Sequence, residues 1–293
     1  MIKSKNSFWR SPFNITILFF LIIYSTSMLM SLFWGLMTSF KSVFEFDVNV
    51  LGFPQKFQAN FITALQEFYI DVETEISVRA VYMPEMFVNS ILYAVGCSFM
   101  ATITPCIVAY LCAKFKYKFS NIVYVTVLIT MTIPIVGSGP SEIQMARDLG
   151  IYDTIWGMYI MKTSFLSMYF LVFHATFEMM PNGYTEAAKL DGASNLQVLI
   201  QIILPLVKST IFTVWLLGFI GYWNDYNTPM IYIPSHPTVA QGMWTFFQST
   251  GNEISSVPMK LAGAMTMALP IIIIFVIFQK KLMGNLNIGG LKE

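Results

Sequence analysis

The chain alternates long apolar runs with shorter polar stretches, and six of the runs are long enough to cross a membrane. They cover approximately residues 15–40, 87–113, 119–136, 155–180, 203–231 and 259–278. A helix needs about 20 mostly apolar residues to cross a hydrocarbon core of about 30 Å. The pattern therefore predicts an all-α membrane protein with six transmembrane helices in one domain, residues 1–293.

Three polar stretches stand out between and after the predicted spans. Residues 41–86 are predicted to form an external loop, 181–202 a loop between spans four and five, and 279–293 a tail. A secretory signal peptide has an apolar core of only about 7–15 residues, so the longer first run is expected to be a retained span.

Composition agrees with a membrane protein. The 293 residues are 56% hydrophobic and 11% charged, whereas soluble proteins carry about 25% charged residues. The formal charge of +1 and the lack of a basic cluster give no reason to expect nucleic acid as a partner. The three cysteines, at 97, 106 and 112, match no zinc-ligand spacing.

The distribution of basic residues predicts the orientation. If the N-terminus is cytoplasmic, the inner segments hold eleven of the 17 lysines and arginines. Because cytoplasmic segments of membrane proteins are enriched in these residues, both termini are predicted to lie inside. The same orientation places the 181–202 loop in the cytoplasm.

The sequence shows no catalytic constellation. It contains no G-x-x-x-x-G-K-[ST] phosphate-binding loop and no H-E-x-x-H zinc motif. Its two histidines, His174 and His236, have no evident catalytic partners. We therefore expect no catalytic, cofactor or metal site, and any uphill transport must draw its energy from another subunit.

The 181–202 loop has the local signals of a helix, a sharp turn and a second helix. Asn182 and Thr185 are plausible caps, and Glu186 lies in the first turn, where a carboxylate complements the helix dipole. Gly192 can adopt positive φ and end this helix. Pro205 suits the start of the next one.

The spacing in this loop resembles the E-A-A-x3-G-x9-I-x-L-P signature of ABC importer permeases. The resemblance implies a cytoplasmic loop folded as two short helices that dock on an ATPase subunit, with the alanines allowing close approach. The residues to which this coupling role would fall are Glu186, Ala187, Ala188, Asp191, Gly192, Leu204 and Pro205.

The end of the fifth predicted span resembles the W-N-[DE]-[FY] element of carbohydrate permeases. From Leu204, about twenty helical residues at 1.5 Å each place this element near the outer side of the membrane. Amides, a carboxylate and flat aromatic rings suit a sugar, although an interfacial aromatic belt would have the same composition. The candidate substrate-path residues are Trp223, Asn224, Asp225, Tyr226 and Asn227.

The tail resembles that of the second, maltose-type permease subunit, which reaches between the ATPase subunits. Candidate ATPase contacts are Gly289, Gly290 and Lys292. Asn285 stands where the family pattern has its first glycine. Asparagine also tolerates a left-handed backbone.

These resemblances imply a multi-pass subunit of a bacterial cell membrane importer for sugars or oligosaccharides. The implied partners are a second, different permease, two ATPase subunits that hold ATP and Mg, an extracytoplasmic solute-binding protein and the lipid bilayer. Two alternatives stay open: an ABC importer permease for a non-sugar solute, and an ion-coupled secondary transporter. A membrane enzyme is a more distant one.

Overall fold

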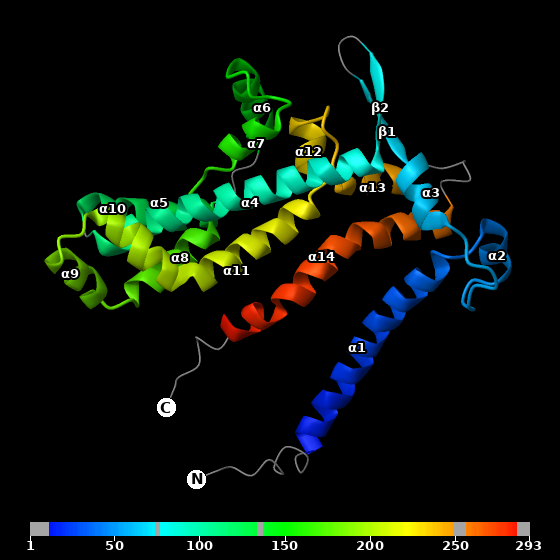
Figure 1. Ribbon diagram of the computed structural model, residues 1–293, viewed down its shortest axis with the longest axis horizontal. Helices are drawn as coiled ribbons and strands as arrows, with labels where there is room; N and C mark the ends of the chain where they lie inside the picture. The colour runs from blue at the N-terminus through cyan, green and yellow to red at the C-terminus, as the bar shows by residue number, and fades with distance from the viewer. Residues whose placement is uncertain (1–11, 74–76, 116, 134–136, 249–255, 286–293) are drawn as a thin grey trace. The chain divides into compact units, whose positions relative to one another are not determined.

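The computed structural model describes residues 12–73, 77–115, 117–133, 137–248 and 256–285. The chain divides into two compact units. One comprises Met1–Phe68 and Thr245–Ala268, and the other comprises Tyr69–Trp244 and Leu269–Glu293. Figure 1 shows the helices and strands with their labels.

The first unit begins with α1 (Pro12–Thr38), which is followed by the short helices α2 (Val43–Val48) and α3 (Asn60–Glu67). The Ser42 hydroxyl caps α2 by accepting from the Glu45 N–H. Lys41 is buried and donates to the carbonyls of Asn49 at 2.7 Å and Val50 at 3.1 Å. The polar segment after the first span is therefore ordered by its own hydrogen bonds.

The second unit begins with an antiparallel hairpin that leads directly into the long helix α4, which packs against α11 and α8 (Figure 1). Aromatic and aliphatic side chains, Phe170 and Phe173 among them, fill its main core. Its elements are β1 (Tyr69–Glu73), β2 (Val78–Tyr82), α4 (Met83–Lys114), α5 (Lys118–Thr132), α6 (Gly139–Asp148), α7 (Ile155–Met161), α8 (Met168–Glu178), α9 (Gly183–Leu190), α10 (Asn195–Gln197), the π-helix η2 (Val198–Ile203), α11 (Leu204–Trp223) and α12 (Asn227–Tyr232). Helices α13 (Val239–Gln248) and α14 (Val257–Asn285) each contribute to both units.

Four helices in the described part of the chain are long and apolar enough to cross a membrane. They are Pro12–Thr38, Met83–Lys114, Asn195–Trp223 and Val257–Gln279, at the first, second, fifth and sixth predicted spans. The third predicted span contains the apolar but shorter α5, of 15 residues. Its last three residues, 134–136, lie outside the described residues.

The predicted fourth span, 155–180, is not one helix. It forms α7 and α8, separated by a non-helical stretch from Lys162 to Ser167. Hydroxyl groups in this stretch bond to nearby backbone: Thr163 Oγ1 donates to the Ile160 carbonyl, and Ser164 Oγ accepts from the Leu166 N–H. Such local bonds compete with the helical ladder, which accounts for the break.

The predicted fifth span, 203–231, has both boundaries displaced. The helix begins at Asn195 and ends at Trp223. It stops there because the Asn224 amide donates back to the Ile220 carbonyl at 2.8 Å, and Asp225 Oδ1 accepts from the Thr228 N–H at 3.0 Å as α12 begins. The predicted external loop, 41–86, contains α2, α3 and the hairpin, and α4 starts at Met83 within it.

Candidate functional site

The loop between α8 and α11 forms one short helix and a tight turn. Helix α9 ends in two backbone hydrogen bonds: Ala193 N–H to the Ala188 carbonyl at 2.9 Å, and Gly192 N–H to the Lys189 carbonyl at 3.0 Å. This pair of bonds needs a left-handed residue after the C-cap, and Gly192 has φ +84°. The prediction that Gly192 ends the first helix is confirmed.

The second helix of the loop is not a separate short helix, which corrects the expectation drawn from the family resemblance. It begins at a capping box in which Ser194 Oγ accepts from the Gln197 N–H and Gln197 Oε1 accepts from the Ser194 N–H. It then continues without interruption through the π-turn into α11.

Pro205 lies where the π-turn passes into α11 and not at the beginning of the helix. The Leu204 N–H, just before it, bonds five residues back to the Leu199 carbonyl. A proline inside a helix removes one hydrogen bond and clashes with the carbonyl four residues earlier. The wider π-turn gives that carbonyl more room, so the helix stays continuous.

A lysine from another helix holds the start of α9. Lys114, the last residue of α4, donates from Nζ to the Met180 carbonyl at 2.6 Å and to Asn182 Oδ1 at 3.0 Å. Asn182 therefore does not cap α9 with its side chain, although it occupies the N-cap position. The other predicted cap, Thr185, lies inside α9.

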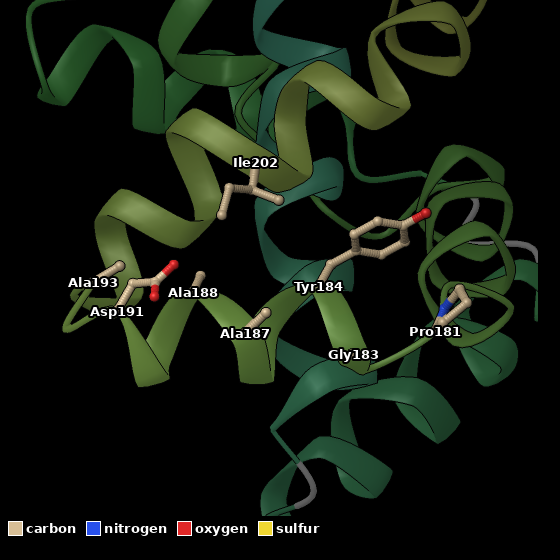
Figure 2. Close-up of a pocket in the computed structure, with 8 residues that line it drawn as sticks. All are labelled: Pro181, Gly183, Tyr184, Ala187, Ala188, Asp191, Ala193 and Ile202. Atoms are coloured by element: carbon tan, nitrogen blue, oxygen red, sulfur yellow. The ribbon is translucent and has the colours of Figure 1, made fainter.

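A groove of about 590 Å³ lies between α9 and the π-turn. Figure 2 shows the methyl groups of Ala187 and Ala188 pointing toward Ile202 across it. Ala187 is exposed, whereas Ala188 is 7% exposed and packs into the main core. The full lining is Pro181, Gly183, Tyr184, Ala187, Ala188, Asp191, Ala193 and Ile202.

The other predicted coupling residues differ in exposure. Glu186 and Pro205 are exposed, and Leu204 is partly buried against the main core. Glu186 has no ion pair or side-chain hydrogen bond to any residue that the structure describes. Its carboxylate is therefore available to a partner.

Three exposed apolar side chains in this loop were not predicted from the sequence. Leu190 is 89% exposed, Leu196 is 64% exposed and Tyr184 is 51% exposed. All three lie in the stretch that the sequence predicts to be cytoplasmic. They could have been noticed in the sequence as large apolar residues within the 181–202 loop, the most polar stretch between spans after residue 86.

The C-terminal end of α11 brings the candidate substrate-path residues together but leaves few of them exposed. The Trp223 ring is 1% exposed and packs between Phe87 and Phe219. Tyr226 stacks on Trp244 with ring centroids 4.3 Å apart. The most accessible of the five are the two asparagines, Asn224 and Asn227.

Asp225, the only charged residue of this element, already has partners. Its Oδ2 accepts from the Tyr93 hydroxyl on α4 at 3.0 Å, while Oδ1 accepts from the Thr228 N–H. These bonds tie α11 and α12 to α4. The carboxylate therefore positions helices in this structure.

Two further expectations concern the tail and metal sites. Gly289, Gly290 and Lys292 lie outside the described residues. Among the residues that the structure does describe, no three His, Cys, Asp or Glu side chains lie close enough to hold a metal ion.

Comparisons with known proteins place the chain among transport proteins. Residues 101–283 match the family described as binding-protein-dependent transport system inner membrane component. The chain is 28% identical to the inner membrane ABC transporter permease protein YcjP of Escherichia coli, over 100% of each chain. It is 23% identical to the diacetylchitobiose uptake system permease protein NgcG of Streptomyces coelicolor, covering 92% of this chain and 86% of that one.

Two more similarities are to a curated permease and to a solved structure. The trehalose/maltose transport system permease protein MalG of Thermococcus litoralis is 28% identical, over 72% of this chain and 76% of that one. A solved bacterial ABC transporter involved in the import of the acidic polysaccharide alginate contains a similar chain. The TM-score is 0.73 at 22% identity, covering 92% of this chain and 95% of that one. At this identity the structural likeness concerns the fold.

Proposed function

Because this chain belongs to the family of binding-protein-dependent transport system inner membrane components, we propose that it is the pore-forming permease of an ATP-driven sugar importer. Its place in the membrane follows from the family and from its apolar helices. The proposed assembly contains a second, different permease, two ATPase subunits that bind ATP and Mg, and an extracytoplasmic binding protein.

The observation that carries the coupling part of the proposal is the exposed apolar loop. An 89% exposed leucine at the end of α9, next to an open groove, is unfavourable in water and expected at a docking surface. Closure of the ATPases would push on α9, and the continuous helix from Asn195 to Trp223 would carry the movement to the outer side. Glu186 would add a charged contact at the groove.

The sugar part of the proposal is supported by the relatives, whose names refer to diacetylchitobiose and to trehalose or maltose. We assign the substrate path to the outer end of α11, where Asn224 and Asn227 are exposed. Trp223, Asp225 and Tyr226 would shape this region through their packing against α4, α11 and α13. The tail residues Gly289, Gly290 and Lys292 would meet the ATPase subunits.

In this proposal the chain spans the membrane six times with both termini inside. The four long apolar helices provide four of the crossings. Helix α5 provides the third, and α7 with α8 provides the fourth as an interrupted span. Broken spans are tolerated where neighbouring protein or a watery path satisfies the freed backbone groups.

The test is purification of the tagged chain from its own host in mild detergent, with identification of the chains that accompany it. We expect an ATPase and a second permease in near-equal amounts. Leu190→Asp should reduce the retained ATPase at least about tenfold, since burying a leucine contributes about 1.5–3 kcal/mol and a carboxylate cannot replace it. Val78→Asp, at a 65% exposed residue of β2, is the matched control.

Two results would contradict the proposal. A chain that purifies without any ATPase would favour an ion-coupled transporter. Equal retention of the ATPase by the Leu190 and Val78 variants would show that α9 is not part of the docking surface.

A further inference from the structure

The break in the fourth span places a positive charge inside the second unit. Lys162 is the C-cap of α7, and its N–H bonds to the Met158 carbonyl at 3.0 Å. It is half-buried. An ionisable residue within a span is costly, and it usually faces a bundle interior or a watery path.

The surroundings of this lysine are aromatic. Its Nζ lies 5.9 Å from the centroid of the Tyr222 ring on α11. Tyr222 belongs to a cluster with Tyr93 and Cys97 of α4 and Tyr159 of α7. Tyrosine rings offer a weak cation–π attraction at this distance, which does not replace an anion.

Lys162 makes no direct contact with an anion in the part of the chain that the structure describes. No carboxylate oxygen lies within 4.0 Å of its Nζ, and its side chain makes no hydrogen bond. The other described lysines that are not exposed make such contacts: Lys41 and Lys114 each donate to two oxygens, and Lys260 donates to one. Lys162 is therefore unusual among the interior cations.

The two carboxylates on neighbouring elements are bonded to other groups. Asp225 accepts from the Tyr93 hydroxyl at 3.0 Å and from the Thr228 N–H at 3.0 Å. Glu142 on α6 accepts from the Tyr232 hydroxyl at 2.9 Å, and it interacts electrostatically with Lys162 only from beyond 4.0 Å. Lys162 is therefore the charged group here that makes no direct contact with an opposite charge.

We propose that Lys162 forms a subsite for a carboxylate group of the transported saccharide, so that the substrate class is an acidic sugar. The ammonium would bind the carboxylate, and the Tyr222 ring would offer a flat face to the sugar ring. A neutral sugar would leave the ammonium without a directly contacting anion, which is costly where water is scarce. This inference rests on the proposed function and names its substrate class.

The experiment uses the complex of permease and ATPase chains in nanodiscs, without added binding protein. The probes are digalacturonate and the neutral disaccharide galactobiose, which differ only in carboxylate against hydroxymethyl groups. Dissociation constants are measured by titration calorimetry. We expect digalacturonate to bind at least about tenfold more tightly than galactobiose.

Lys162→Gln should abolish this preference, and Lys162→Arg should keep most of it because the charge is retained. Lys260→Gln is the control, since the Lys260 ammonium already donates to the Phe247 carbonyl at 3.1 Å. It should leave the preference unchanged.

Several outcomes would overturn the inference. Equal binding of the two probes, no binding of digalacturonate, or an unchanged preference in Lys162→Gln would each do so. Loss of the second permease from the Lys162→Gln complex would assign the cation to a subunit contact instead. Binding of galactobiose alone would leave sugar transport standing, and the proposed function itself is judged separately by the co-purified ATPase.

Discussion

The contact between Lys114 and the 181–202 loop leads to a prediction about the stability of α9. Substitution of Lys114 by methionine keeps the length and apolar stem of the side chain but removes both hydrogen bonds, to the Met180 carbonyl and to Asn182 Oδ1. Both acceptors lie just before α9, so their release should allow this helix to detach from α4 more often.

The magnitude follows from the geometry of the two bonds. Hydrogen bonds with a charged partner contribute about 1.5–3 kcal/mol each. The bond to Asn182 is exposed and the bond to Met180 is only partly buried, so water compensates for much of the loss. We expect local opening of α9 to become about 1–3 kcal/mol easier, which corresponds to an increase of about 5- to 150-fold.

Hydrogen–deuterium exchange of the complex in nanodiscs measures this opening directly. The amides of Gly183–Leu190 should exchange faster in Lys114→Met by the stated factor, while amides in the middle of α4 keep their rates. Lys189→Met is the matched control, because it removes an exposed positive charge from α9 itself. Unchanged exchange in Lys114→Met, or the same increase in both variants, would refute the role of Lys114 as an anchor.

Two further predictions concern the turn after α9 and the contact between α6 and α12. Gly192→Ala should lower the free energy of unfolding by about 1–2 kcal/mol, measured by thermal unfolding, because Gly192 has φ +84°. No atom crowds the added methyl group at Gly192 or at the control Gly183, so Gly183→Ala should not lower it. Equal losses in the two variants would argue against backbone strain at Gly192. Hydrogen bonds from Ser138 and Tyr232 lower the pKa of Glu142. Their contribution to stability is therefore fully present above the ordinary carboxyl pKa. It is lost as the pH falls through the lowered pKa of Glu142. Tyr232→Phe should therefore flatten the fall in melting temperature between about pH 5 and pH 3, and Tyr152→Phe, which removes a hydroxyl bond to the Ile231 carbonyl, should not.

The features predicted well from the sequence are those that depend on neighbouring residues. Long apolar runs identified four membrane-length helices, because length and hydropathy are properties of a continuous segment. Gly192 was identified as a turn because few other residues adopt its backbone angles. In both cases the cause lies within a few residues of the effect.

The features that were missed depend on contacts between distant segments or on competition within a segment. The bond between Lys114 and Asn182 joins residues 68 positions apart, and the bond between Tyr93 and Asp225 joins residues 132 apart. Nothing local predicts either bond. The break after Lys162 was hidden because apolar residues on both sides dominate the pattern, whereas the hydroxyl groups that interrupt the helix are few.

The π-turn before Pro205 has a geometric consequence for the loop. Each residue of an α-helix turns the chain by about 100°, since a full turn takes 3.6 residues. The helix is continuous from Asn195 to Trp223. The number of residues between Gly192 and Pro205 therefore sets the direction in which α9 points around the helix axis, as well as its distance along that axis. Removing one residue from the α-helical part of this interval, Asn195–Gln197, would rotate α9 by about 100° around the helix axis and aim the groove in a different direction.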